Sequence, residues 1–535
     1  MGFLSNDRST LQLSTTDLSH LIADNDKCRF VVDFVSRLDL SSLYGSYKSQ
    51  GGDAYDPAIL LATWFYAYSE GIDSTRVLEK LCKRDLCYIY VSAHLTPDHC
   101  ALSRFRRRHL ELLPLYFEQL LQMALDQSLS DFGEINIDGS KIKASASKKR
   151  SKNAEQLERL LEKTRQSIDS YLQRCESEDT QGDEQDLEAL RREKDRLEQF
   201  EEKILQSQQD LQIRQSTLKP EYREAHKINF TDPDARMMAS IKAPGYNAQA
   251  AVDSSSYLIV ATDVVCEAND TQQFAPMHQR TETLLPEDPQ RRYNMDAGYH
   301  SFEQFEYIDQ HHIDAVIADP KRENRANPIA PTPLEELLQN DQKIERSDFF
   351  FDAQNDVYQC PNGQKLSFQR HFKRGKTYGQ TYQASSCENC PLEKRCLPPK
   401  NRSGVKQIHR QEREPLAEAM RDKLQTPEAK QRLKTRMTTV EPVFGNLKAN
   451  LGFTSFRLRG EKQVKGEFML MAIAHNLNIL YRLLEVIQFI RLVYGSSASI
   501  YMILKISKIK NHFIIIIKIG RNPTLSDYKP CYAGK

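Results

Sequence analysis

The sequence has no excess of charge of either sign, and it has no segment typical of export or of a membrane span. Lys and Arg number 74 against 73 Asp and Glu, so the formal net charge is +1. This balance does not mark the whole chain as a nucleic-acid binder, so any such surface must be local. Residues 1–14 contain no basic stretch followed by an apolar one, and we expect no secretory signal. Arg491 and Gly495 interrupt the apolar run 486–504, which makes it a poor membrane span.

Cysteine is plentiful, with 11 residues. In the cytoplasm, where we expect this protein, cysteines are thiols or metal ligands rather than disulfides. Cys387 and Cys390 have the spacing that lets two sulfurs bind one metal ion. The segment resembles a zinc ribbon, and we predict Zn²⁺ binding by four thiolates: Cys360, Cys387, Cys390 and Cys396. His371 or His409 is an alternative ligand, and a knuckle of reduced, buried cysteines is the alternative interpretation.

Short helices are predicted for the N-terminal part of the chain. Apolar residues recur at helical spacing from residue 57 to 81, and Gly71 followed by Ser74 indicates a new helix start. A second helix contains a run of basic residues. This arrangement favours a helix-turn-helix-like DNA-binding module, with contacts from Arg104, Arg106 and Arg107. A helical bundle with a solvated arginine face is the alternative.

Alternating and heptad patterns divide the middle of the chain. Residues 134–144, 246–253 and 257–265 alternate as strands do, and further strands are predicted at 293–296 and 313–318. Between the first two strands, leucines and isoleucines repeat every three, four or seven positions, which predicts an antiparallel helical hairpin. Asn247 and Gln249 alternate with apolar residues, so we expect them to face DNA or solvent.

Three acidic residues form a candidate metal site. Asp138 and Asp296 are each predicted at a strand end before small residues, and Glu441 lies on a predicted helix that starts near Pro442. Carboxylate oxygens are the ligands that Mg²⁺ prefers. Spacing alone does not prove that these residues converge. In residues 398–448, 12 Lys and Arg stand against 6 Asp and Glu, a local excess that favours either phosphate contact or a solvated face.

Several ordered motifs resemble the insertion-sequence transposases of the DDE superfamily. They are NIDGSKIKA, TDPDARMM, PGYNAQAAVD, NMDAGYHS, TTVEPVFGNLKANLGFTSFRLRG and KGEFMLMAIAHNLNIL, with YDPAILLATWFYAYSEGIDSTRVLEK and LTPDHCALSRFR nearer the N-terminus. The resemblance extends from about residue 20 to 485. It implies an α/β fold with an RNase H-like core, a mixed five-stranded sheet with flanking helices. A helical N-terminal domain, a helical-hairpin insert and a small Cys-rich insert complete the expected architecture.

The resemblance also implies an activity and its residues. Asp138, Asp296 and Glu441 match the family's catalytic positions and are expected to hold two Mg²⁺ or Mn²⁺ ions. Lys448 and Arg436 are expected to contact DNA near the cleavage point, although Arg436 departs by one position from the family spacing. The expected partners are the terminal inverted repeats and target DNA, both double-stranded, with a homodimer in the active complex and no membrane. Association with the nucleoid is therefore expected.

Two other functions remain open at this point. One is a catalytically silent DNA-binding repressor derived from a transposase, and the other is a nuclease that cuts without joining strands. The predicted segments are a helical N-terminal domain (1–130), a first core strand (131–150), a helical hairpin (151–218), an RNase H-like core (219–350), a Cys-rich insert (351–410), core helices (411–485) and an atypical tail (486–535). The tail resembles no part of the family, and we interpret it as a read-through or frameshifted extension containing a short strand at 514–517.

Overall fold

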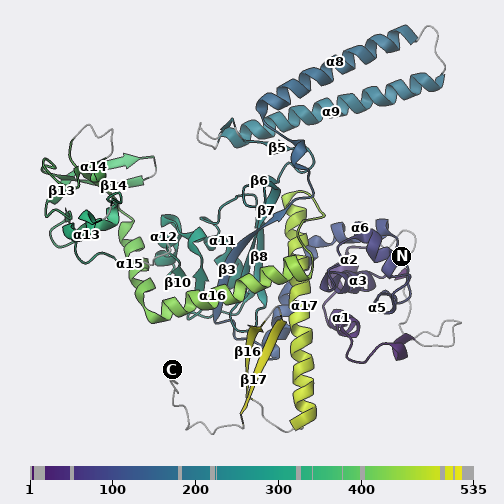
Figure 1. The fold of residues 1–535 in the computed structure, drawn as a ribbon. Helices are drawn as coiled ribbons and strands as arrows, with labels where there is room; N and C mark the ends of the chain where they lie inside the picture. Colours follow the sequence, from purple (N-terminus) through teal and green to yellow (C-terminus); the bar gives the residue numbers. More distant parts are fainter. Residues whose placement is uncertain are drawn as a thin grey trace. The chain divides into compact units, whose positions relative to one another are not determined.

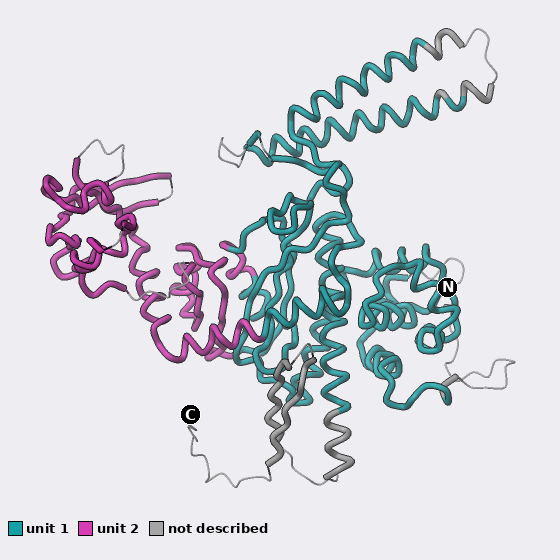
Figure 2. The backbone as a smooth tube through the Cα atoms, in the orientation of Figure 1, with its two compact units in different colours: residues 1–270, 277–287, 439–535 teal, residues 271–276, 288–438 magenta. Residues whose placement is uncertain are grey.

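Two compact units make up the chain (Figure 2). Unit 1 comprises residues 1–270, 277–287 and 439–535, and unit 2 comprises residues 271–276 and 288–438. The structure is a computed structural model. It describes residues 3–4, 18–47, 54–178, 184–216, 223–224, 226–320, 327–339, 341–375, 377–397, 404–494, 501–509 and 512–520. Both units contain helices and strands, so the chain is of the mixed α/β class expected from the sequence.

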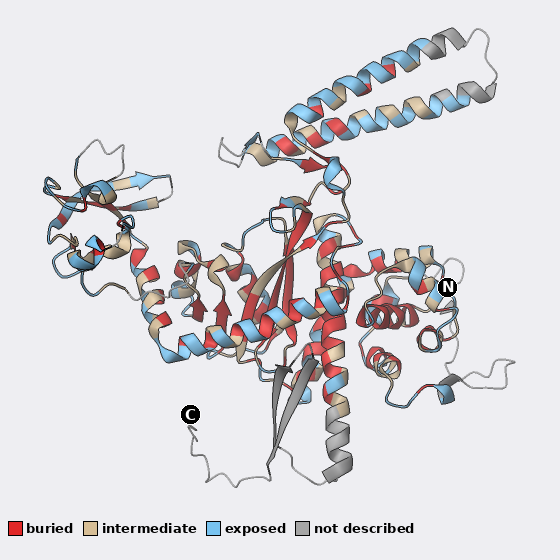
Figure 3. Ribbon diagram, viewed as in Figure 1, coloured by how far each residue is buried: buried red, intermediate tan, exposed pale blue. Residues whose placement is uncertain are grey.

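Short helices form the N-terminal part of unit 1 (Figure 1). They are η1 (Leu18–Leu21), α1 (Lys27–Ser36), α2 (Ser41–Gly45), α3 (Pro57–Ser69), α4 (Thr75–Leu81), α5 (Leu86–Val91), α6 (His99–Arg108), η2 (Leu110–Leu112) and α7 (Leu113–Asp126). Helix α3 starts where Asp56 accepts the N–H of Ala58 and Pro57 takes the first helical position. It is buried on nearly every side (Figure 3). The predicted break is confirmed, because Gly71 has a φ of 74° and Ser74 precedes α4.

A pair of long helices follows the first core strand. They are α8 (Ala154–Glu178) and α9 (Glu184–Ser216), which lie side by side as a hairpin (Figure 1). Leu157 of α8 packs with Ile204 and Leu211 of α9, and Ile228 closes this small core. The base of the hairpin is a two-stranded ladder of β4 (Ser151–Lys152) and β5 (Ile228–Asn229). Because the apolar residues lie on one face of each helix, the pair buries them against each other.

The sheet of unit 1 is antiparallel and centred on β7. Its strands are β3 (Glu134–Lys143), β6 (Arg236–Met238), β7 (Ala243–Asp253) and β8 (Ile259–Val265). Strand β3 pairs with one edge of β7, and β6 and β8 pair with the other. The strands predicted at 246–253 and 257–265 are confirmed as β7 and β8, which pair as a hairpin. It turns where the Asp253 carboxylate accepts the N–H groups of Ser255 and Ser256.

The C-terminal helices of the core are α16 (Pro427–Gly445), the π-helix η6 (Asn446–Asn450) and α17 (Glu461–Tyr494). Helix α17 packs on β8 and on helices α3 and α7. The Asn476 side chain on α17 donates to the Ile259 carbonyl at 2.7 Å and accepts the Ile259 N–H at 2.8 Å. Asn476 therefore satisfies both backbone groups of a residue in β8, which joins the helix to the strand.

Unit 2 contains a parallel pair of strands with a helix between them. The elements are β9 (Arg292–Met295), η4 (Ala297–Tyr299), α12 (Phe302–Gln310) and β10 (Asp314–Ile317), followed later by α15 (Glu414–Gln425). Buried Arg432 donates to the Asn294 side chain at 2.8 Å, to the Tyr293 carbonyl and to Asp314 at 2.8 Å. One guanidinium thereby holds both strands. Helix α11 (Phe274–Leu284) has residues in both units.

The Cys-rich segment of unit 2 is a five-stranded antiparallel sheet. Its strands run in the order β11 (Phe350–Asp352), β12 (Val357–Gln359), β13 (Lys365–Arg374), β14 (Thr377–Ala384) and β15 (Gln407–Gln411). Short helices α13 (Leu334–Leu338), η5 (Arg346–Asp348) and α14 (Glu393–Cys396) accompany it. Buried Tyr358, Leu366, Tyr382 and Ile408 form its core.

The remaining ladders are short or terminal. They are β1 (Phe3–Leu4) with β2 (Ala54–Tyr55), and β16 (Tyr501–Ile509) with β17 (His512–Gly520); η3 (Lys148–Arg150) is a single turn. The strand predicted at 514–517 is confirmed within β17. Among the residues that the structure describes, no helix has the length and hydropathy that crossing a membrane requires.

Candidate active site

Asp138 lies in the middle of β3, so the prediction that it stands at a strand end was wrong, although the strand itself was predicted at 134–144. The strand continues to Lys143 because its far half still pairs with β7. Asp138 is half-buried, and its Oδ1 accepts the N–H of Gly139 at 2.8 Å. Asp138 stands opposite Ala250, and Ser140 on the same face stands opposite Ala248. These alanines add little side-chain volume next to the carboxylate.

The opposite face of β3 carries a buried polar network. The Asp270 carboxylate accepts hydrogen bonds from Gln249 at 2.6 Å, from Asn247 at 2.7 Å and from Lys141 at 3.1 Å. Asn247 and Gln249 are fully buried, so the expectation that they face DNA or solvent was wrong. A Cβ on Gly139 would lie 2.2 Å from the Gln249 amide and 2.5 Å from the Asp270 carboxylate. Only glycine fits at this position, directly after Asp138.

Glu441 lies inside α16, which passes through Pro442 instead of starting near it, contrary to the prediction. Pro442 has no N–H to donate to the carbonyl four residues earlier, and the α-helix ends three residues after it, where the π-helix η6 begins. Glu441 is exposed, and no residue in the described part of the chain forms a hydrogen bond or ion pair with its carboxylate. The carboxylate is therefore accessible to an external ligand.

Lys448 lies next to Asp138 in unit 1. Its Nζ donates to the Ser140 hydroxyl at 2.5 Å and to the Lys141 carbonyl at 3.0 Å. Burial lowers the pKa of the Lys448 ammonium, as does the charge of Lys141, whereas Asp138 raises it. Lys448 belongs to η6, and such π-helical turns are frequent at functional sites. The turn brings a half-buried cation to the strand that bears Asp138.

His475 holds this turn in place. Its Nε2 lies 3.0 Å from the Tyr257 carbonyl, and its Nδ1 lies 3.1 Å from the Asn446 amide nitrogen. A neutral ring that donates from Nε2 and accepts at Nδ1 satisfies both contacts. Burial lowers the pKa of His475 to about 4. The buried histidine thus links α17 to the π-helix that carries Lys448.

Asp296 and Arg436 face each other in unit 2. Asp296 directly follows β9, as predicted, and its Oδ1 accepts the Gly298 N–H at 2.9 Å. Its Oδ2 lies 4.0 Å from Nη2 of Arg436, and the side chains are 44% and 7% exposed. Arg436 is thus buried beside a carboxylate that remains open to solvent. This placement suits a role through Asp296 better than a direct contact with DNA.

The three arginines of α6 have different surroundings. Arg106 is buried, donates to the Tyr68 hydroxyl and the Asp73 carbonyl at 2.9 Å each, and lies over the Trp64 ring. A DNA contact is incompatible with this burial, so the expectation for Arg106 is corrected to a structural role. Arg104 and Arg107 are exposed, and with Arg76 and Arg108 they line an open, 620 Å³ depression between α4 and α6.

The cysteines predicted to bind zinc lie together in unit 2. Cys360, Cys387, Cys390 and Cys396 pack against one core and line one cavity of about 70 Å³. The Cys360 sulfur accepts the Gln364 N–H at 3.2 Å, and the Cys387 sulfur accepts the Lys406 N–H at 3.3 Å. The alternative ligands do not join them. His409 bonds to Thr381 at 2.9 Å, and His371 is exposed on β13.

A second group of possible metal ligands has its ligand atoms closer together than the four cysteines do. Among the described residues, only Asp26, Cys28 and Cys87 bring three ligand atoms within 4.8 Å of one another. The sulfurs of the Cys-rich segment are therefore more widely spaced, although they share a cavity.

Comparison with known families identifies the chain. Residues 16–108 match a family described as "Transposase domain (DUF772)", and residues 359–481 match one described as "Transposase DDE domain". Both matches support an insertion-sequence transposase of the DDE type, a family that implies a DNA substrate. No curated protein and no solved structure matched the transposase.

The matched regions contain some of the candidate residues. Glu441, Lys448, Arg436 and the four cysteines lie in the second region, and the arginines of α6 lie in the first. Asp138 and Asp296 lie in neither. Sequence reasoning missed Asp270, which holds the network beneath Gly139, because only the fold brings it to β3.

The stability of the transposase should fall between pH 6.5 and 4 through His475. Its folded-state pKa of about 4 is below the ordinary 6.5, so the unfolded chain binds the proton more readily in this window. The contribution is complete above pH 6.5 and is lost as the pH falls toward 4. We expect His475→Gln to reduce the pH slope of the urea-unfolding free energy by up to about one proton. His311→Gln, at an exposed position, should leave the slope unchanged, and an unchanged slope in His475→Gln would contradict the assignment.

Proposed function

We propose that this transposase cleaves DNA at the terminal inverted repeats of an insertion sequence and joins the released ends to target DNA. The observation that carries the proposal is the surroundings of Asp138, a half-buried carboxylate beside Lys448 on a face where Ala248 and Ala250 add little side-chain volume. In the proposed reaction, hydrolysis of a phosphodiester releases a 3′-OH, which then attacks a target strand. Transposition joins two DNA ends, so we propose a homodimer as the active complex, located at the nucleoid in the cytoplasm.

An RNase H-like core is the fold proposed for this chemistry. Along the chain, three antiparallel strands (β3, β7 and β8) precede two parallel strands (β9 and β10) that are joined by α12. The candidate carboxylates lie within the first of these strands, directly after the fourth, and in the later helix α16. This order of elements supports the proposal.

Asp138, Asp296 and Glu441 are proposed to hold two Mg²⁺ or Mn²⁺ ions. All three donors are carboxylates, the donor type that these hard cations prefer. The exposed Glu441 carboxylate and the 44% exposure of Asp296 leave oxygens available for ions. Such ions activate the attacking oxygen and neutralise charge on the phosphate.

Arg436 and Lys448 are proposed to support the carboxylates. Arg436 faces Asp296 at 4.0 Å and precedes Glu441 by five positions on the same helix, a rise of about 7.5 Å. It offsets the negative charge of Asp296 before an ion binds. Lys448, half-buried beside Asp138, does the same there and offers a cation to a DNA phosphate.

Substitution Glu441→Gln should abolish end cleavage and strand transfer on an inverted-repeat substrate with Mg²⁺. The loss of activity should exceed the roughly 10–100-fold loss that is typical when a residue hydrogen-bonded to a metal ligand is replaced. Glu428→Gln is the matched control, because Glu428 lies on the same helix with an exposed ion pair. Full activity in Glu441→Gln would refute the metal site. Specific DNA binding by the unaltered protein without any cleavage would favour the repressor.

Arg104 and Arg107 are proposed to bind DNA phosphates. They lie three positions apart on α6, so both face the depression that Arg76 and Arg108 also line. Thr75 and Ser103 add hydroxyl groups to the same surface. An open surface with four guanidinium groups suits a phosphate backbone.

Each of Arg104→Ala and Arg107→Ala should weaken binding to the inverted repeat. The slope of log affinity against log salt should fall by about 0.9 for each phosphate that the variant no longer neutralises. Lys80→Ala is the control, because Lys80 is exposed on α4 but does not line the depression. Binding curves with unchanged salt slopes in both arginine variants would place the DNA-binding surface elsewhere.

The four cysteines of unit 2 are proposed to bind Zn²⁺. Backbone N–H groups donate to the sulfurs of Cys360 and Cys387, which favours the thiolate form, and the shared cavity of the four cysteines supports a common ion. Binding must draw the sulfurs closer together. Burial raises the pKa of Cys360 and of Cys396, so zinc uptake should release protons.

Cys390→Ser should remove one zinc ion per chain, measured by elemental analysis of the purified protein. Cys100→Ser is the control, because Cys100 is an exposed cysteine outside the cluster. Equal zinc contents in the two variants would show that the cysteines are a reduced structural knuckle.

A further inference from the structure

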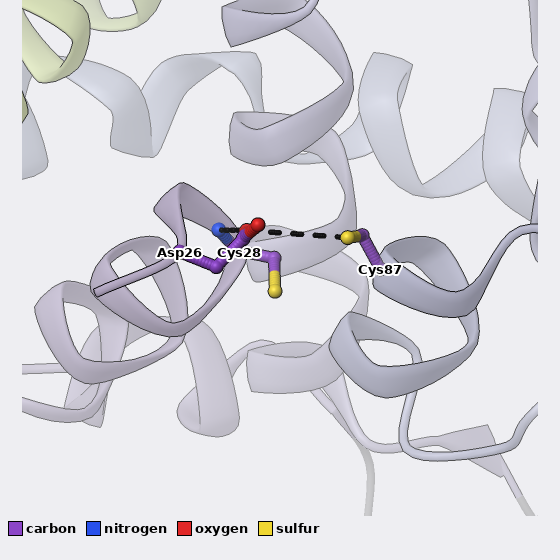
Figure 4. Close-up of side chains that lie close together, drawn as sticks. All are labelled: Asp26, Cys28 and Cys87. Atoms are coloured by element: carbon purple, nitrogen blue, oxygen red, sulfur yellow. Dashed lines mark hydrogen bonds between the residues drawn. The ribbon is translucent and has the colours of Figure 1, made fainter. Parts of the chain in front are cut away.

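A second, smaller group of metal-ligating side chains lies in the N-terminal helices. Asp26 stands at the N-cap of α1, Cys28 is the second residue of that helix, and Cys87 is the second residue of α5. Figure 4 shows the Asp26 carboxylate between the two helices, with a dashed line to the Cys87 sulfur. The three ligand atoms lie within 4.8 Å of one another. The fold thus gathers an aspartate and two cysteines from segments 61 positions apart in the sequence.

We propose that Asp26, Cys28 and Cys87 bind a Zn²⁺ ion, separate from both metal sites proposed above. With Zn–S bonds of about 2.3 Å and Zn–O bonds of about 2.1 Å, neighbouring ligand atoms in a tetrahedral site stand roughly 3.6–3.8 Å apart. The Cys87 sulfur lies 3.9 Å from Oδ1 of Asp26, close to that spacing. Two thiolates with one carboxylate suit Zn²⁺ better than Mg²⁺. The fourth position is left to water.

Acidic side chains gather around the cluster. The Cys87 sulfur lies 3.9 Å from the Asp26 carboxylate, and Asp85 caps the helix that begins beside Cys87. Zinc binding displaces the protons of cysteine ligands, so two thiolates and one carboxylate would hold the dication.

The backbone already holds two of the ligands in position. The Cys28 N–H donates to Oδ1 of Asp26 at 2.8 Å, and the Cys87 N–H donates to Asp85 at 3.0 Å. Cys28 is fully buried and Cys87 is partly exposed, so the site is accessible from one side. A bound ion would join α1 to α5 and stabilise the domain that carries the exposed arginines of α6.

Zinc content of the full-length protein tests the proposal. Cys87→Ser and Asp26→Asn should each lose one zinc ion per chain relative to the unaltered protein. Asparagine caps a helix as well as aspartate does, so Asp26→Asn should keep α1 intact. The matched controls are Cys100→Ser, and Asp98→Asn at the N-cap of α6, which should keep their zinc.

Alkylation of Cys87 provides a second measurement on the unaltered protein. The thiol should react slowly with iodoacetamide, and faster after a chelator is added, whereas Cys100 should react equally in both conditions. Because Cys390→Ser removes only the zinc of unit 2, failure of either zinc proposal is distinguishable from failure of the other. Zinc contents of Cys87→Ser and Asp26→Asn equal to the controls would overturn the proposal, as would a disulfide between Cys28 and Cys87.

Discussion

Unit 1 depends on the burial of polar side chains along α17. Glu467 accepts the N–H groups of Arg457 and Leu458, Asn476 satisfies both backbone groups of Ile259, and His475 lies between a carbonyl and an amide. Each of these groups would cost about 1–3 kcal/mol if it were left buried without its partner. One helix thereby fixes the edge of the sheet, the connection to the N-terminal helices and the π-helix that carries Lys448.

Burial also divides the arginines of α6 into a buried one with a structural role and exposed ones that are accessible to DNA. Arg106 reaches Glu467 through the Tyr68 hydroxyl, which donates to the Glu467 carboxylate at 3.4 Å, and Arg106 is buried inside the domain. Arg104 and Arg107 lie on the same helix but point to solvent. Three basic residues within one turn thus divide between stability and recognition, according to the face of the helix that each occupies.

Donor chemistry divides the proposed metal sites of the transposase. The ligands proposed for the catalytic ions are all carboxylates, which suit a hard cation that must exchange a ligand with phosphate. The ligands proposed for zinc include cysteines of the N-terminal helices and of the Cys-rich segment of unit 2, where a softer ion would add stability to segments with small cores. The proposed sites therefore differ in ligand type.

The sequence by itself determined the elements with strong local signals. The β7–β8 hairpin, the start of α4 after Gly71 and the position of Asp296 after β9 follow from alternation, turn residues and caps, which act within a few positions. Only the tertiary structure decided that Asp138 lies within β3, that Arg106 is buried, and that Cys28 meets Cys87. Pairing with β7, packing against Trp64 and the contact of α1 with α5 join residues far apart in the chain, and no local pattern encodes such contacts.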